Sequence, residues 1–251
     1  MSDERKLGGL IAGSGRIVAF TGAGISAESG IPTYRGEGGA WHKYDPNVYA
    51  NINYFLKDPT YYWNYYCEVR YPLLRKARPN DAHLALARLE EEGKLSAVIT
   101  QNVDGLHQEA GSQRVIELHG TTRRIYCMSC GVDYSMDGVF EMLKERNPPA
   151  CTSCGGMLRP AVVFFGEQLP QGALDEAVEE ARSCDLMLAI GSSLVVHPAA
   201  SLPVYAKESG ARLAIINKGE TPLDEIADLK IDDAAGAVLP AALNQAGLWH
   251  L

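Results

Sequence analysis

Four cysteines stand in two equally spaced pairs, and sulfur at this spacing points to a bound metal. Each pair has two residues between its cysteines, and twenty residues separate the pairs: Cys127, Cys130, Cys151 and Cys154. Each pair can grip one edge of a tetrahedral ion from a tight turn, as in a four-thiolate zinc ribbon. Four sulfurs leave no open coordination position, so we expect one structural Zn2+ and not a catalytic one.

A glycine-rich stretch near the start of the chain could hold a dinucleotide. It contains Gly22-x-Gly24-x-x-Ala27 after the apolar residues 17–19, which is the alanine variant of the pyrophosphate-binding pattern. A dehydrogenase would place an acidic residue at the end of a second strand about twenty residues later, to bind the ribose. That region instead reads Gly-Gly-Ala-Trp-His-Lys over residues 38–43. We therefore expect chemistry other than hydride transfer.

The elements that must position these residues alternate between strand and helix. Apolar runs at 17–21, 95–100, 185–190 and 212–216 suit buried parallel strands, and each leads into glycine, serine, asparagine or aspartate. Helical patterns at 81–92, 172–183 and 198–209 separate them, the first with Asp81 as its N-cap and with Leu84, Ala87 and Leu89 on its apolar face. This alternation predicts a doubly wound, Rossmann-like α/β fold with ligands at the carboxyl ends of the strands.

Two segments interrupt this alternation, so we expect a smaller second domain. Residues 1–36, 80–122 and 160–251 would form the dinucleotide-binding domain. Residues 37–79 and 123–159 would form a helical insert and the four-cysteine zinc module. The net charge of 23 − 31 = −8 argues against a nucleic-acid partner, which requires clustered Lys and Arg. No apolar run is long enough for a membrane span, and the charged residues 1–6 are not followed by the apolar region of a secretory signal, so we expect no membrane partner. The six cysteines are typical of a reducing cytosol, so we expect a cytoplasmic protein, and we also expect a monomer.

Taken together, the motifs resemble the sirtuins, a family of NAD-dependent protein deacylases, in their prokaryotic form. They follow the order of the family from about residue 15 to residue 235: Gly22-Ala23-Gly24-Ile25-Ser26, Ser29-Gly30-Ile31-Pro32-Thr33-Tyr34-Arg35, Thr100-Gln101-Asn102-Val103-Asp104, Glu117-Leu118-His119-Gly120, Phe165-Gly166-Glu167 and Gly191-Ser192-Ser193. The resemblance implies that NAD is consumed. Nicotinamide leaves, and the acetyl group of an acetyl-lysine protein passes to ADP-ribose to give O-acetyl-ADP-ribose.

The resemblance also implies residue roles. His119 would be the general base, aided by Asn102, Asp104 and Arg35. Val163 and Phe165 would wall a tunnel for the acyl-lysine, between two segments that pair with an extended peptide: Gly166, Glu167, Gln168 and Leu169, and Val195, Val196 and His197. Residues 28–39 would form a lid. NAD itself would contact Gly22, Ala23, Gly24, Ser26, Ala27, Ile31, Tyr34, Arg35, Gln101, Asn102, Val103, Asp104, His119, Gly191, Ser192, Ser193, Asn217, Lys218, Gly219 and Ala235.

The chain departs from the family pattern in two places. Thr33-Tyr34 stands where many members have Asp-Phe. Members that prefer succinyl or malonyl groups carry an arginine three residues after a tyrosine, whereas here Val69 stands at that distance from Tyr66 and Arg70 is one place further. A shift of one residue turns a helical side chain by about 100°, so we expect Arg70 to point away from the site and acetyl to be preferred. The tyrosines around Trp63 are interpreted as helix packing.

Two other functions remain open at this point. An NAD-dependent dehydrogenase with a structural zinc would form NADH. A zinc-ribbon binding module would leave NAD unchanged, although the acidic net charge and the polar strand ends weigh against it.

Overall fold

Six parallel strands form the central sheet in the computed structural model, which describes residues 2–35 and 39–249. The four predicted strands are confirmed as β1 (Ile17–Thr21), β2 (Leu95–Thr100), β7 (Leu186–Ile190) and β8 (Arg212–Ile216), and two short strands extend the sheet, β3 (Val115–Glu117) and β9 (Leu229–Ile231). The strand order is β3-β2-β1-β7-β8-β9, and every pairing is parallel. Every residue of β1 and β7 is buried, as their continuous apolar sequences predict.

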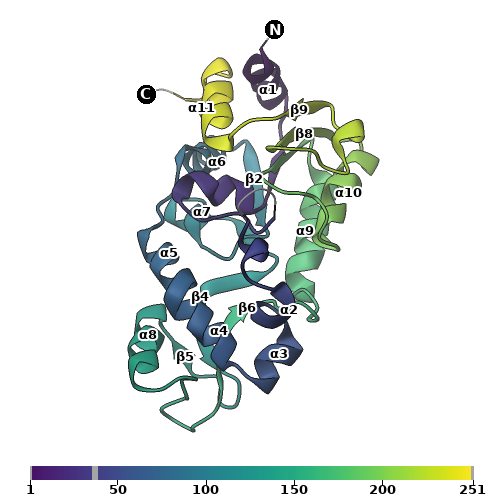
Figure 1. The fold of residues 1–251 in the computed structure, drawn as a ribbon. Helices are drawn as coiled ribbons and strands as arrows, with labels where there is room; N and C mark the ends of the chain where they lie inside the picture. Colours follow the sequence, from purple (N-terminus) through teal and green to yellow (C-terminus); the bar gives the residue numbers. More distant parts are fainter. Residues whose placement is uncertain (1, 36–38, 250–251) are drawn as a thin grey trace.

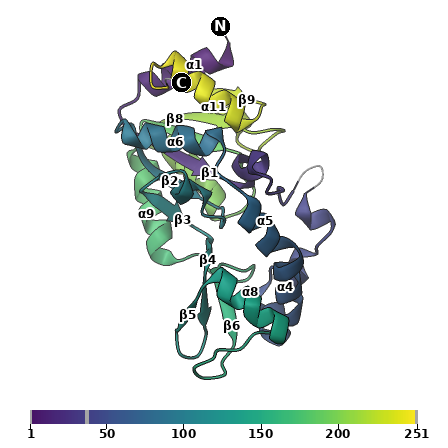
Figure 2. The same ribbon diagram turned by 90° about the vertical axis from the view of Figure 1, so that its left-hand side faces the viewer.

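Helices cover both faces of this sheet (Figures 1 and 2). One face packs against α1 (Asp3–Ala12), α6 (Asp81–Glu91) and α11 (Ala235–Gln245). The opposite face packs against α9 (Gln171–Ser183) and α10 (Leu202–Glu208), which follows a short 3-10 turn at Ala199–Ser201. The doubly wound α/β prediction is therefore confirmed.

The start of α6 corrects one detail of the sequence prediction. Asn80, not Asp81, is the N-cap, because its side chain accepts hydrogen bonds from the N–H groups of Ala82 and His83. The buried face of the helix consists of Ala82, His83, Ala85, Leu86 and Leu89. Leu84, which we expected to be buried, is 41% exposed, because the buried stripe runs through Ala82, Ala85, Leu86 and Leu89 and a residue two places before Leu86 points to the other side of the helix.

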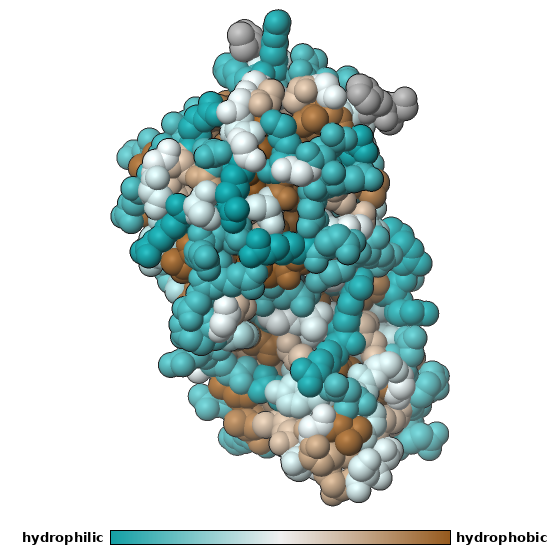
Figure 3. All heavy atoms as spheres, turned by 180° about the vertical axis from the view of Figure 1, so that it is seen from behind, coloured by the Kyte–Doolittle hydropathy of each residue, from teal (hydrophilic) through white to brown (hydrophobic). Residues whose placement is uncertain are grey.

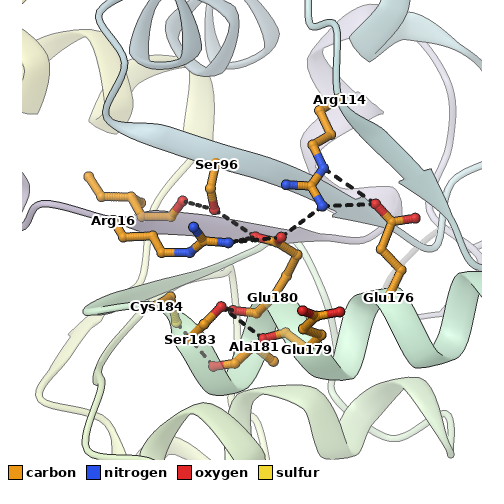
Figure 4. A network of polar contacts seen from close by, with 10 residues as sticks. Arg16, Ser96, Arg114, Glu176, Glu179, Glu180, Ala181, Ser183 and Cys184 are labelled. Carbon is orange, nitrogen blue, oxygen red and sulfur yellow. Dashed lines mark hydrogen bonds and ion pairs between the residues drawn. The ribbon is translucent and has the colours of Figure 1, made fainter.

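A buried carboxylate fastens α9 to the amino-terminal ends of three strands (Figure 4). Glu180 of α9, with its side chain 4% exposed, accepts hydrogen bonds or ion pairs from Arg16 before β1, Ser96 in β2 and Arg114 before β3, each at 2.8 Å. Two cations and a hydroxyl donor offset the cost of burying this charge. Ligands bind at the carboxyl ends of the strands in such sheets, so the network lies at the edge of the sheet away from the expected site.

The two interrupting segments pack together below the sheet (Figures 1 and 2). The first contributes α2 (Pro46–Tyr49), α3 (Ile52–Lys57), α4 (Thr60–Tyr65), a π-helical turn (Tyr66–Arg70) and α5 (Tyr71–Lys76), and the second contributes β4 (Gly120–Cys127), β5 (Asp133–Tyr134), α8 (Met136–Glu145) and β6 (Leu158–Val162). Trp63 and Tyr66 from the first segment share one apolar cluster with Ile125 and Leu158 from the second. The packing predicted for the aromatic residues around Trp63 is confirmed for these two.

Hydrophilic and hydrophobic residues are unevenly distributed over the face of the molecule that Figure 3 shows. In the face shown in Figure 3, hydrophilic residues cover most of the upper body, and hydrophobic residues are more frequent toward the lower end. Met128 and Val132 of the cysteine-bearing segment are among the exposed large hydrophobic side chains, at 42% and 41%. Among residues 2–35 and 39–249, no helix is both long and apolar enough to span a bilayer.

Candidate functional site

A large cavity lies at the carboxyl ends of the strands, between the sheet and the lower body. Its volume is about 1280 Å³, larger than the roughly 300–1,000 Å³ of a site for one small molecule. Most of the predicted site residues line it: Gly22, Ala23, Gly24, Ala27, Tyr34, Arg35, Gln101, Asn102, Val103, His119, Val163, Phe165, Gly166, Glu167, Gln168, Leu169, Gly191, Ser192, Ser193, Val196, His197, Asn217, Lys218, Gly219 and Ala235. Ser26, Ile31 and Asp104 line a smaller adjoining cavity of about 50 Å³, and Val195 lines neither.

The strand order reverses at β1, which has β2 on one side and β7 on the other. The cavity begins at this point, as is usual for ligand sites in doubly wound sheets. The loops after β1 and β7 meet there without side chains between them. Gly24 N–H donates to the carbonyl oxygen of Gly191 at 2.8 Å, and a Cβ on Gly24 would lie 2.6 Å from Gly191 Cα. The glycines are therefore required for this interlock, and it leaves a bare backbone rim that a pyrophosphate can approach. The segment after Gly22 forms a 3-10 helix, Ala23–Ser29.

Asn102 and Asp104, which follow β2, are held by hydrogen bonds to the β1 loop. The amide nitrogen of Asn102 donates to the carbonyl oxygen of Gly22 and to Ser26 Oγ, each at 3.1 Å. Ser26 Oγ in turn donates to Asp104 Oδ2 at 2.8 Å. Both amide hydrogens of Asn102 are thereby used, so its side-chain oxygen is the group left to accept a hydrogen bond from a ligand. Gln101 differs, because its amide nitrogen donates to Ser192 Oγ across the cavity.

His119 lines the cavity just beyond β3 and has a defined tautomer. Its Nδ1 lies 2.9 Å from the carbonyl oxygen of Gln101, which can only accept a hydrogen bond, so Nδ1 carries the proton. Nε2 is then the unprotonated nitrogen. Burial lowers the pKa of His119, and the hydrogen bond to Gln101 opposes this effect in part. The ring is therefore neutral at pH 7 and able to accept a proton.

The segment predicted to bind a peptide is fixed by an internal ion pair. The carboxylate of Glu167 receives two hydrogen bonds from Arg159, at 2.8 and 2.9 Å, and one from the backbone N–H of Phe164 at 2.9 Å. Burial raises the pKa of Glu167, but the Arg159 and Phe164 donors outweigh burial and leave the pKa below its usual value. Glu167 lines the cavity, yet its carboxylate shapes the segment from within and is not presented to a ligand.

The backbone groups of the predicted peptide-binding segments differ in whether they are already hydrogen-bonded. The N–H and C=O groups of Phe165 bond to Ala50 and Ile52, at 2.7 and 3.1 Å, so Phe165 offers only its side chain to the cavity. Among the described residues, Gln168 and Val195 form no backbone–backbone hydrogen bond. Their main-chain groups are available to an extended chain lying between them.

Charged side chains also fix two backbone segments that line the cavity, the turn after β8 and the start of α11. Lys230 Nζ donates to the carbonyl oxygens of Asn217 and Gly219, at 2.7 and 2.8 Å, and this fixes the turn after β8. Glu28 accepts the N–H of Gly236 at 2.8 Å and thereby joins the β1 loop to the start of α11. Ala235 is the first residue of that helix.

Three of the cavity residues that escaped the sequence prediction come from α4 and the π-helical turn that follows it. Tyr62, Tyr65 and Arg70 all line the cavity, although we expected Arg70 to point away and the tyrosines only to pack. The prediction for Arg70 is wrong because the helix closes a π turn over Tyr66–Arg70, which adds one residue to the turn and brings Arg70 back to this face. Tyr66 instead is fully buried in the apolar cluster. The signal in the sequence was the spacing between Tyr66 and Arg70, which is one residue longer than the three-residue spacing of the succinyl- and malonyl-preferring members.

The four cysteines predicted to bind zinc come together as a set. Their sulfur atoms all lie within 4.8 Å of one another, with Cys127–Cys154 at 3.5 Å and Cys130–Cys151 at 3.6 Å. Four sulfurs about 2.3 Å from one zinc ion in a tetrahedron lie about 3.8 Å apart, so the set fits this ion. Tyr134 Oη donates to Cys151 Sγ at 3.1 Å, which stabilises a thiolate. The site is structural because the four sulfurs complete its coordination.

Comparisons with known proteins agree with this geometry. The sequence profile described as the Sir2 family matches residues 22–198. The chain is 49% identical over 247 residues to the NAD-dependent protein deacylase 2 of Archaeoglobus fulgidus, covering 98% of this chain and 97% of the relative. It is 50% identical over 240 residues to the NAD-dependent protein deacetylase of Sulfurisphaera tokodaii, covering 95% of this chain and 94% of the relative.

Solved structures extend the similarity to the whole fold. A Sir2 complex with a p53 peptide and NAD+ superposes with a TM-score of 0.91 at 43% identity, over 99% of this chain and 100% of that one. A Sir2 complex with a deacetylated p53 peptide and 3'-O-acetyl ADP-ribose gives 0.94 at 43% identity, over 98% and 99%. With this profile match, this identity and this coverage, the chain belongs to the Sir2 family.

Proposed function

We propose that this protein is an NAD-dependent lysine deacetylase that consumes NAD and transfers the acetyl group of acetyl-lysine to ADP-ribose. The observation that carries the proposal is the position of His119, a neutral imidazole in one continuous cavity with the glycine rim and the peptide-facing segment. The similar solved structures contain an acetylated peptide, NAD+ or 3'-O-acetyl ADP-ribose.

The residues divide the work by their chemistry. The bare backbone of Gly22 and Gly24 receives the pyrophosphate, and Asn102 accepts from a ribose hydroxyl or a water through its side-chain oxygen. Asp104 lines the small adjoining cavity and accepts from the carboxamide of nicotinamide. The acyl oxygen then displaces nicotinamide from the ribose carbon.

His119 acts in the next step. Its Nε2 removes a proton from a ribose hydroxyl, and the resulting oxygen attacks the acyl carbon now attached to the same ribose. The hydrogen bond from Nδ1 to Gln101 keeps the imidazole in the tautomer that leaves Nε2 free. Water then releases free lysine and O-acetyl-ADP-ribose, and Val163 and Phe165 shield the acyl chain.

The experiment is an incubation with NAD and an acetyl-lysine peptide, in which nicotinamide release and peptide deacetylation are measured together. We expect equal amounts of both products and none with His119→Ala, whose thermal unfolding should match the wild type. Formation of NADH would favour a dehydrogenase, and no turnover of NAD would favour a binding module. Full activity of His119→Ala would refute the assigned base.

We also propose a cytoplasmic monomer without a direct nucleic-acid partner. The net charge of −8 supports the last point. Cysteines at metal-ligand spacing are typical of a reducing compartment. Light scattering coupled to size exclusion tests the monomer, which a mass near twice 27.2 kDa would contradict.

A further inference from the structure

The two departures from the family pattern, Tyr34 and Arg70, touch each other. Arg70 Nη2 donates to Tyr34 Oη at 2.9 Å, across a sequence separation of 36 residues. Tyr34 belongs to the segment Ile31–Arg35, called the flap below, and Arg70 ends the π-helical turn of the lower body. A phenylalanine at position 34 would have no atom to accept this bond.

Arg70 lies among tyrosine side chains. Among the described residues, none of its nitrogens forms an ion pair with a carboxylate. Its guanidinium lies 5.8 Å from the ring centroid of Tyr65. Tyr62 and Tyr65 stay neutral because burial raises both pKa values, that of Tyr62 to about 12. The flap hydroxyl is therefore a hydrogen-bonding partner of the cation in this structure.

Backbone hydrogen bonds also join the flap to neighbouring residues of the chain. Ile31 N–H donates to Ser26 C=O at 3.2 Å, and Ala40 N–H donates to Thr33 C=O at 2.8 Å. Both bonds join residues that are close in the sequence. The bond to Arg70 is of another kind, because it joins the flap to a helix beyond the loop.

The position of the contact gives it a consequence for the cofactor. Tyr34 and Arg70 line both the large cavity and the small cavity that also contains Asn102 and Asp104. A flap held down at this point closes the nicotinamide side of the site. A flap released at this point opens the nicotinamide side of the site to water and lets nicotinamide leave.

We propose that Arg70 is a positioning residue that latches the flap closed through the hydroxyl group of Tyr34, and so sets how tightly the nicotinamide end of NAD is held. This inference rests on the proposed function. It assigns Arg70 to the cofactor side of the site and to no step of proton transfer. The π turn is what allows a residue of the lower body to reach the flap.

The test compares Tyr34→Phe, Arg70→Met and the double variant, each assayed for KM of NAD, KM of the peptide and inhibition by nicotinamide. Hydrogen bonds to charged groups contribute enough that we expect about a tenfold rise in KM for NAD in each single variant. The KM for the peptide should change less than twofold. The KM for NAD of the double variant should be no higher than that of the more affected single variant, because either substitution alone already removes the same hydrogen bond.

Controls separate this role from a general loss of structure. Arg75→Met removes an exposed arginine from α5, the next helical segment, where it faces Asp137 at 3.6 Å, and should leave all three constants unchanged. Tyr34→Phe deletes one oxygen atom only, so it tests the latch even if Arg70→Met fails to fold. Arg70→Lys keeps the charge and should restore part of the affinity.

Three results would overturn the latch: additive effects in the double variant, an unchanged KM for NAD in Tyr34→Phe, or a loss confined to succinyl-lysine peptides. The last result would assign Arg70 to the acyl group and not to the flap. A wild-type protein that consumes no NAD would instead refute the proposed function, so the two failures are distinguishable.

Discussion

Acid should destabilise this fold through two histidines buried directly behind the site. His83 and His107 are 0% and 1% exposed, and their ring centroids lie 4.9 Å apart. His107 Nε2 lies 3.0 Å from Thr21 Oγ1, and Thr100 Oγ1 accepts both from Thr21 and from the backbone N–H of Asn102. A positive charge on either ring would therefore perturb the hydrogen bonds that hold the loop carrying Asn102.

The magnitude follows from the shift in pKa. Burial lowers the pKa of His83 to about 4, against an opposing effect of Asp104, and burial together with His83 lowers the pKa of His107 well below its usual value. Between pH 7 and pH 5 the unfolded chain binds a proton at each histidine, with a pKa of about 6.5, while the native state does not. The free energy of unfolding must therefore decrease as the pH falls from 7 to 5. His83 alone accounts for about 2 kcal/mol, and His107 adds to it.

The assay is urea unfolding of the zinc-loaded protein at pH 7 and pH 5, for the wild type and His83→Gln. The variant loses part of the α6 capping box and should be less stable at pH 7. Its further loss on acidification should be smaller than that of the wild type by about 2 kcal/mol. Effects of acid on the cysteine site cancel in this comparison.

The matched control is His197→Gln, which removes an exposed imidazole. It should lose as much stability between pH 7 and pH 5 as the wild type does. Equal pH dependence in the wild type and His83→Gln would refute the reasoning, because the buried ring would then titrate alike in both states.

Three further predictions concern the site. Because burial lowers the pKa of His119 and the base must be neutral, the acidic limb of the kcat/KM profile should have its midpoint below pH 6.5, and a midpoint above 7 would contradict this. Cys151→Ser should lower both bound zinc and the melting temperature, as should a chelator on the wild type; an unchanged melting temperature would argue against a structural ion. Glu167→Gln leaves Arg159, 9% exposed, without its carboxylate, so we expect about 2 kcal/mol of destabilisation and a severalfold higher KM for the peptide at unchanged KM for NAD, measured by urea unfolding and steady-state kinetics.

Much of the fold and site could be predicted from local pattern. The strands at 17–21, 95–100 and 212–216 were predicted with their observed bounds, because a strand buried on both faces must be continuously apolar. The domain boundaries stay a prediction. Predictions of single orientations were less successful, as Leu84 and Arg70 illustrate, because one residue of helical register decides which way a side chain points.

The sequence by itself determined the chemistry that is available: four thiolates at metal spacing, glycines where backbones must meet, and a histidine after a short strand. Only the tertiary structure decided how these groups are used. It directed the Glu167 carboxylate inward to Arg159, fixed the proton of His119 on Nδ1 and brought Arg70 to Tyr34 across 36 residues. The reason is physical, since spacing along a chain constrains neighbours within a turn or a strand, whereas contacts between distant segments depend on packing throughout the fold.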